Sequence, residues 1–212
     1  MSRYTDSLKL NVGSEMQMDE MEYHRRKNYK AKLGIHEDWF IDNIDTKTRF
    51  MVASSYGKSR SYKELKQVAK LAKAKTCEQF KIITTDGLNA YPRVLRKVFC
   101  LNKLNAKSKV QHNQKIASDN EGFNYPIERL HNNIRARTKV FRCFYGSIDS
   151  ANAIMKGYEI YYNFITKHQA LKCCPYELAV PELKGKLGIN KWLDLINFGS
   201  SKNYSEKLTE VI

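Results

Sequence analysis

The sequence is short of acidic residues and has no long hydrophobic run. Its 212 residues include 37 Lys or Arg but only 22 Asp or Glu, which gives a formal net charge of +15. No stretch approaches the roughly 18 apolar residues of a membrane helix, and the opening MSRYTDSLKL lacks the apolar block of a signal peptide. We therefore expect a soluble cytoplasmic protein with no membrane partner. The positive charge favours a polyanionic partner, most simply nucleic acid.

Cysteine is scarce and poorly spaced for disulfides or zinc. The chain has five cysteines, an odd number, none of them forms a CxxC pair, and adjacent Cys173 and Cys174 are a poor start for a zinc site. We expect reduced thiols, mostly buried, and no bound zinc. Internal repeats and low-complexity linkers are also absent, so the length predicts one domain with a good core.

Strand and helix patterns alternate along the chain. Strands are expected at 14–20, at 79–87, near Val110, and as a hairpin whose arms are 39–44 and 48–54. Helical spacing of apolar residues predicts helices at 61–75, 88–99, 124–142, 147–165 and 187–198. Ser61 and Glu64 have the spacing of a capping box. This order indicates an α/β fold, with a mixed central sheet flanked by helices.

The helix predicted at 124–142, NYPIERLHNNIRARTKVFR, contains one acid and a series of basic residues. Steps of three or four residues from Glu128 place the following residues on one stripe: His131, Arg135, Lys139 and Arg142. The apolar residues fall on the other side: Ile127, Leu130, Ile134 and Phe141. An acid therefore heads a cationic ridge that could track a phosphate backbone, and Arg129 and Arg137 add to its charge.

Two further acids occupy positions where a ligand could bind. Asp86 ends the buried strand pattern Ile82–Thr85, and ligands of α/β sheets bind beyond the carboxyl ends of strands. Asp19 lies within the first predicted strand. If Asp19, Asp86 and Glu128 converge, their oxygens suit two Mg²⁺ ions, or Mn²⁺ in their place, and such a pair catalyses in-line phosphoryl transfer.

Each acid also has an ordinary interpretation, and composition does not distinguish these three from the other acids. Asp86 before Gly87 is typical of a turn, Asp19 can be a surface acid, and Glu128 in a first helical turn is favourable with the helix dipole.

Four segments, in this order, resemble the catalytic core of an insertion-sequence DDE transposase, a family of the retroviral-integrase-like superfamily with an RNase H-like fold. They are Met18–Met21 followed by Trp39–Asp45 and Thr48–Phe50; Ile82–Pro92; Asn124–His131 with Arg135, Arg137, Lys139 and Val140; and Tyr162–Phe164 followed by His168, Leu171 and Pro175. The resemblance covers about residues 13–183. Each motif alone is weak, whereas four in the family's order are specific.

The resemblance implies that Asp19, Asp86 and Glu128 are the catalytic and metal-binding triad. It also implies that Arg135 contacts the transposon end, within a DNA-binding set of Arg129, His131, Arg135, Arg137, Lys139 and Arg142. The family's reaction needs metal: water frees a 3′-hydroxyl at the element's end, and that hydroxyl attacks target DNA. The partners would be transposon ends and target DNA near a prokaryotic nucleoid. Paired ends argue by analogy for a homodimer or higher assembly.

Some features depart from the family pattern or leave alternatives open. Asp42 and Asp45 rival Asp19 as the first acid, although the family's Asp-Glu dipeptide matches at Asp19 and Asp45 resembles a turn residue. The separation of Asp86 and Glu128 is longer than usual, which indicates an insertion within 100–122. We expect a lead-in at 1–12, the core at 13–183 and a helical tail at 184–212, with no N-terminal DNA-recognition domain. A truncated transposase, a purely hydrolytic RNase H-like nuclease and a non-catalytic DNA-binding remnant all fit this expectation.

Overall fold

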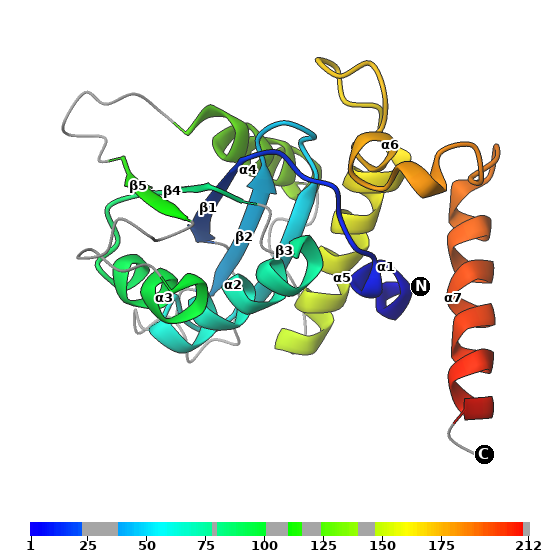
Figure 1. Cartoon of the computed structure of the whole chain (residues 1–212), viewed down its shortest axis with the longest axis horizontal. Helices are drawn as coiled ribbons and strands as arrows, with labels where there is room; N and C mark the ends of the chain where they lie inside the picture. Colours follow the sequence, from blue (N-terminus) through cyan, green and yellow to red (C-terminus); the bar gives the residue numbers. More distant parts are fainter. Residues whose placement is uncertain (23–37, 78–79, 101–109, 116–123, 140–146, 210–212) are drawn as a thin grey trace.

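The computed structural model describes residues 1–22, 38–77, 80–100, 110–115, 124–139 and 147–209. Its centre is a five-stranded sheet in the order β3-β2-β1-β4-β5 (Figure 1). The strands are β1 (Glu15–Glu22), β2 (Trp39–Asp45), β3 (Met51–Gly57), β4 (Ile82–Thr85) and β5 (Gln111–Gln114). The β2 strand runs antiparallel to β1 and β3, whereas β4 is parallel to β1 and β5 is parallel to β4. The predicted α/β class with a mixed sheet is confirmed.

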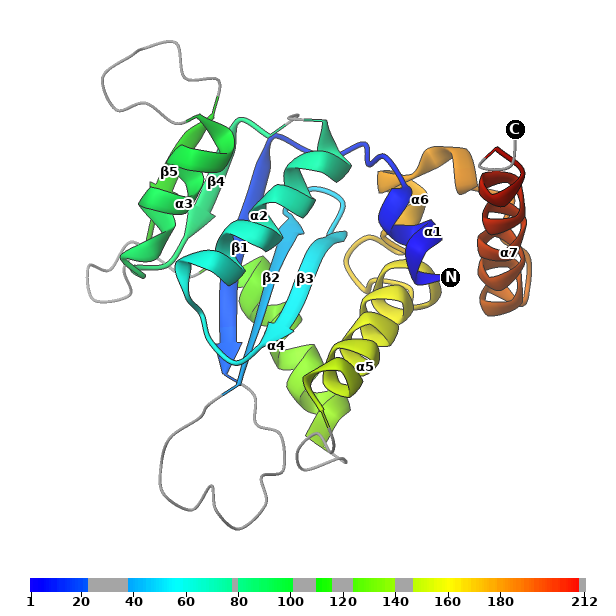
Figure 2. The same ribbon diagram turned by 90° about the horizontal axis from the view of Figure 1, so that it is seen from below.

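Helices cover both faces of this sheet (Figures 1 and 2). One face carries α2 (Tyr62–Thr76) and α3 (Ala90–Phe99), and the other carries α4 (Tyr125–Thr138) and α5 (Ile148–Ile160). The α5 helix continues into a π-helical turn, η4 (Tyr161–Ile165). The remaining elements lie beyond the β3 side of the sheet: α1 (Ser2–Ser7), α6 (Tyr176–Ala179), η5 (Pro181–Leu183) and α7 (Lys191–Thr209). No helix in the described ranges is both long and apolar enough to cross a membrane.

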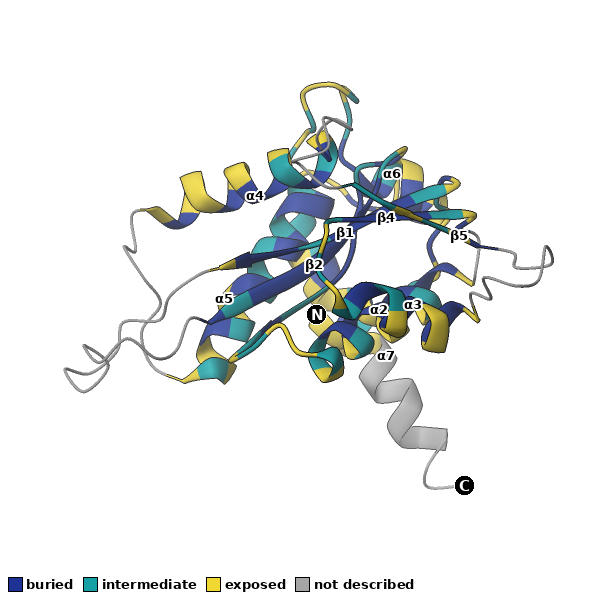
Figure 3. Cartoon of the chain, turned by 90° about the vertical axis from the view of Figure 1, so that its left-hand side faces the viewer, coloured by how far each residue is buried: buried dark blue, intermediate teal, exposed yellow. Residues whose placement is uncertain are grey.

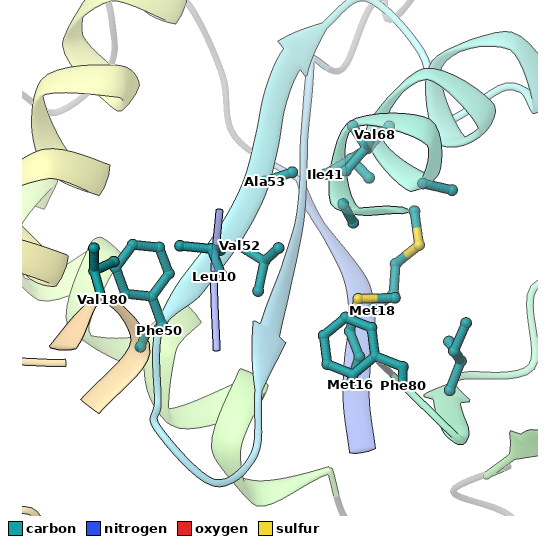
Figure 4. Packing of buried hydrophobic residues seen from close by; sticks show 14 of the residues in the cluster. Leu10, Met16, Met18, Ile41, Phe50, Val52, Ala53, Val68, Phe80 and Val180 are labelled. Carbon is teal, nitrogen blue, oxygen red and sulfur yellow. The ribbon is translucent and has the colours of Figure 1, made fainter. Parts of the chain in front are cut away.

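The β1 strand contributes to a hydrophobic core on each side of the sheet. Met16 and Met18 pack with Phe80 in the core under α2 and α3, as Figure 4 shows. Met21 belongs to the second core, beneath α4 and α5. Because successive side chains of a strand point to opposite faces, a central strand covered on both sides needs apolar residues at odd and even positions. This requirement explains the weak alternation of its sequence.

Most expected elements are found near their expected positions, but the ends of the chain differ. The residues expected to be a lead-in include helix α1, and α7 extends to Thr209, beyond the predicted end at 198. The capping box at Ser61 is not formed as expected, because the Ser61 hydroxyl bonds the Glu64 carboxylate rather than a backbone amide.

The segment before β1 is held by a buried aspartate. Asp45 accepts hydrogen bonds from the Gly13 amide at 3.0 Å and from the Thr48 amide at 2.9 Å. A Cβ atom at Gly13 would lie 2.7 Å from Cβ of Lys47, so only glycine allows this close approach. Asp45 is thus the last residue of β2 rather than a residue of the turn itself, and its side chain holds the turn that follows.

The cysteines match the expectation of buried, reduced thiols only in part. Four of them lie in the described ranges, and all four are free thiols, but only Cys174 is buried, while Cys77 and Cys100 are exposed. The prediction that they are mostly buried was wrong: Cys77 and Cys100 are the residues at which α2 and α3 end, and helix ends lie at the surface. Cys143 lies outside the described residues.

A buried ion pair joins the two helical layers. Lys75 of α2 and Glu159 of α5 are 5% and 2% exposed, and their side chains lie 3.6 Å apart. Glu159 also accepts hydrogen bonds from the Ser54 hydroxyl of β3 and from Lys156, both at 2.7 Å. Asp6 of α1 bonds the same two lysines. One carboxylate thus links α2, the sheet and α5.

We predict that Glu159→Ala lowers the free energy of unfolding by about 3 kcal/mol, because it leaves Lys75 buried with only the half-exposed Asp6 as a partner. Urea denaturation followed by circular dichroism measures the loss. Asp149→Ala, at an exposed position in the first turn of the same helix, is the control and should cost less than about 1 kcal/mol. Equal losses for both variants would contradict the structural role of Glu159.

Candidate functional site

Three carboxylates meet where β4 ends. One oxygen each from Asp19, Glu20 and Asp86 lies within 4.8 Å of the others. Gln17 pairs with Thr84, and two residues further along these parallel strands are Asp19 and Asp86. Because β4 ends at Thr85, Asp86 lies just beyond the end of the strand, at the level of Asp19. The structure thus brings together two of the three predicted acids, at the predicted edge of the sheet.

Hydrogen bonds hold each of these carboxylates in place. Asp19 accepts from the amide of Glu20 at 2.8 Å, and Asp86 accepts from the amide of Leu88 at 3.0 Å in the turn that leads to α3. Glu20, which points to the α2 and α3 side, accepts from the Tyr91 hydroxyl at 2.5 Å and from Arg60 at 2.9 Å. The cluster therefore has fixed acids with oxygens left over for a further ligand.

The electrostatics of the cluster favour the addition of positive charge. Burial, with smaller contributions from the charges of Glu20 and Asp86, raises the pKa of Asp19 to about 7, although His131 and the Glu20 amide oppose the shift. Burial and the charge of Asp86 also raise the pKa of Glu20, against the opposing bonds from Tyr91 and Arg60. Burial and Glu20 raise the pKa of Tyr91, which keeps its hydroxyl a donor. Carboxylate oxygens are ligands of hard cations such as Mg²⁺ and Ca²⁺, so this cluster can hold a metal ion.

His131 is buried rather than exposed on the predicted ridge. It is 4% exposed, its Nε2 lies 2.7 Å from Oδ1 of Asp42, and its Nδ1 lies 3.7 Å from Oδ2 of Asp19. Asp19 and Asp42 are directly opposite on β1 and β2, where like charges repel. Burial lowers the pKa of His131, but Asp42 and Asp19 outweigh burial and raise it overall. The prediction that His131 lies on the exposed ridge was therefore wrong, because the imidazole lies between two carboxylates inside the fold; its contact with DNA stays a prediction.

Glu128 does not belong to the carboxylate cluster that the described residues form. Among the described residues, the group of carboxylates that can share a metal has three members, and Glu128 is not one of them. Glu128 is half-buried in the first turn of α4, one turn before His131. The preceding residue, Ile127, donates its amide to Oε1 of Gln17 at 3.2 Å, which packs the start of α4 against β1. The role of Glu128 as the third acid stays a prediction.

The two rivals of Asp19 have other partners. Asp42 is fully buried against His131, and burial raises its pKa. Asp45 holds the turn that follows β2. Neither belongs to the three-carboxylate group that the described residues form. Asp19 is thus the candidate first acid that lies beside Asp86.

Apart from the buried His131, the cationic ridge is exposed where the structure describes it, as the outward side of α4 shows in Figure 3. Its exposed members are Arg129, Arg135, Arg137 and Lys139. The apolar side of the helix is buried as predicted at Ile127, Leu130 and Ile134. Arg142 and Phe141 lie outside the described residues. Contact of the ridge with DNA stays a prediction.

Sequence reasoning missed the part played by Glu20 and its partners. Because side chains alternate along β1, Glu20 and Asp19 point to opposite faces of the sheet. Their carboxylates nevertheless come together beyond the end of β4. Arg60 reaches Glu20 from the segment before α2 and packs over the Trp39 ring at 4.2 Å. The Asp-Glu dipeptide was the only sequence signal for this arrangement.

No protein-family model matches this sequence, and no curated protein matches it. The geometry of the carboxylate cluster and the order of the motifs therefore carry the functional argument.

We predict that Asp86→Ala abolishes divalent-metal binding, because it removes one of the three carboxylates that could hold the same metal ion. Thermal melting with and without Mn²⁺ tests this, since a ligand present at 100 times its dissociation constant stabilises the folded state by about 2.7 kcal/mol. Asp149→Ala, which removes an exposed acid elsewhere, should keep the full stabilisation. A metal-induced shift that survives in Asp86→Ala would exclude the cluster as the metal site.

We also predict that Asp19→Asn stabilises the metal-free protein at pH 8 by roughly 2 kcal/mol. The folded-state pKa of about 7 exceeds the unfolded value of 3.8, so the wild type loses stability as pH rises through that interval. Urea denaturation in EDTA should show the gain at pH 8 and a much smaller gain at pH 5. A variant that is less stable at both pH values would show that the contact with His131 outweighs the ionisation of Asp19.

Proposed function

We propose that this protein is a DDE-type transposase core, which cleaves DNA at transposon ends and joins them to target DNA. The observation that carries the proposal is the meeting of Asp19 and Asp86 at the end of β4, from two of the motifs that resemble this family. The mixed sheet with helices on both faces is compatible with the RNase H-like fold that we propose for residues 13–183.

The proposed third acid is Glu128, at the start of α4. The Gln17 contact to Ile127 and the His131 contact to Asp19 fix the first turns of this helix against β1. Glu128 lies between these two contacts along the helix and is half-buried, which supports its assignment as the third acid. Tyr91 and Arg60 position Glu20 beside the same acids.

In this proposal Asp19, Asp86 and Glu128 hold two Mg²⁺ or Mn²⁺ ions. Bound metal would supply activation of the attacking hydroxyl and stabilisation of the leaving oxygen during in-line displacement. Tyr91 and Arg60 keep Glu20 oriented, and His131 holds Asp19 from the opposite side. The exposed ridge of α4 positions the DNA backbone beside the acids, since arginine binds phosphate with paired hydrogen bonds.

A non-catalytic DNA-binding remnant is the second candidate. The observation in its favour is that Glu128 lies outside the three-carboxylate group within the described residues. A purely hydrolytic RNase H-like nuclease would use the same acids as a transposase, so only the products separate these two.

Strand transfer in vitro tests the proposal. We expect purified protein with Mg²⁺ or Mn²⁺ to join a labelled duplex, carrying the element's end and a free 3′-hydroxyl, to a plasmid. Glu128→Gln should reduce joining by about 100-fold or more, because it removes a metal ligand. Glu182→Gln, at an exposed position of η5, should leave joining unchanged. Nicks without joined product would favour the nuclease, and DNA binding with neither product would favour the remnant.

A further inference from the structure

A groove of about 640 Å³ lies between α4 and the end of α5. The outward side of α4 forms one wall through Arg129 and Arg137, and the other wall comes from Tyr158, Tyr161 and Tyr162. Residues 166–169, which follow η4, complete it. Figure 2 shows α4 and α5 side by side on the same face of the sheet. The volume falls in the range of about 300–1,000 Å³ that is typical of small-ligand sites.

The tyrosine wall offers aromatic surface to a ligand. The rings of Tyr158 and Tyr162 stack with their centroids 6.2 Å apart, and Tyr161 lies 6.4 Å from Tyr158. Tyr158 and Tyr161 are only half-buried, so part of each ring remains open to the groove. Burial raises the pKa values of Tyr158 and Tyr162, which keeps both hydroxyls protonated as hydrogen-bond donors.

The groove carries positive charge, and no Asp or Glu is among its described lining residues. Arg129, Arg137 and Lys167 are exposed along it. Burial, then Arg49 and Arg129, lowers the pKa of His168. Arg137 lies over the Tyr161 ring at 4.8 Å and donates to its hydroxyl, which holds the guanidinium at the wall.

One lining residue, Thr166, has a buried polar atom without a partner among the described residues. The Thr166 hydroxyl is buried and makes no hydrogen bond within the described part of the chain. A buried polar group without a partner is destabilising unless a ligand or water completes it.

We propose that this groove binds an unpaired nucleotide of a DNA strand, with its base against the tyrosines and its phosphate on Arg129 and Arg137. Aromatic rings beside planar cations are the combination with which proteins bind single-stranded nucleic acid, because every base has a face that stacks. The proposal rests on the proposed function, and it specifies the substrate as DNA that is frayed or single-stranded at the bound position. Arg129 directly follows Glu128, the proposed third acid, so the groove adjoins the part of α4 that the proposed function places beside Asp19.

Fluorescence anisotropy of labelled DNA in EDTA tests the groove independently of catalysis. We expect the full chain to bind a duplex with a short single-stranded overhang about tenfold more tightly than the blunt duplex, the size of one stacked base. Replacement of one overhang base by an abasic sugar should remove this preference. Tyr161→Leu should remove the same preference, and it should bind the abasic substrate as tightly as the wild type does. Tyr161→Phe should retain the overhang preference.

The matched control is Tyr62→Leu in α2. Tyr62 also lies under an arginine, Arg93, at 4.7 Å, but on the opposite face of the sheet. The Tyr62→Leu substitution should leave the overhang preference unchanged, and thermal melting should show that both leucine variants are folded. An equal affinity of the wild type for overhang and blunt duplexes would overturn the proposal. The proposal would also be overturned if Tyr161→Leu weakened binding equally on abasic and intact DNA, because the effect of Tyr161 would then be purely structural.

The two proposals fail in different assays. A protein that shows the overhang preference but no joined product keeps the groove and loses the transposase assignment. A protein that joins DNA ends without any base-dependent binding at Tyr161 keeps the transposase assignment and loses the groove.

Discussion

The parallel register of β1 and β4 is the constraint on which the candidate site depends. Pairing of Gln17 with Thr84 brings Asp19 level with Asp86, which lies just beyond the end of β4 at Thr85. A shift by one residue would turn Asp19 to the opposite face, since side chains alternate along a strand. The methionines of β1 prevent such a shift, because they pack in the two cores that cover its faces. Core packing and the chemistry of the site therefore depend on the same register.

His131 links this sheet to the helix that carries the cationic ridge. Its imidazole lies between Asp42 of β2 and Asp19 of β1, two acids that would otherwise repel each other across the strands. A protonated imidazole offsets both charges and attaches α4 by a polar contact as well as an apolar one. This arrangement ties the charge of Asp19 to the position of the neighbouring Glu128.

The two sides of α4 serve different purposes in the proposed function. Its inner side buries Ile127, Leu130 and Ile134 against the sheet. Its outer side presents arginines, and at Arg129 and Arg137 these meet the tyrosines at the end of α5. The π-helical turn η4 contributes to that meeting, because it carries Tyr161 and Tyr162 at the point where the helix ends. A single helix thus lies between the acids and the aromatic groove.

Sequence alone predicted the order of strands and helices, the α/β class and the edge of the sheet where Asp86 lies. These features follow from local spacing: apolar periodicity identifies helices, and an acid at the end of a buried strand lies where parallel strands open. It also placed Arg135 and Lys139 on an exposed side of α4, which is confirmed, but it placed the buried His131 on the same side.

Only the tertiary structure decided which acids meet and which charged residues are buried. Glu20 joins the cluster because β4 ends early, and His131 is buried because Asp42 lies opposite Asp19 on the neighbouring strand. Both outcomes depend on contacts between residues far apart in the chain, and helical spacing carries no information about them. The positive ridge could be identified one residue at a time, whereas the carboxylate cluster and the tyrosine groove exist only after the strands and helices pack together.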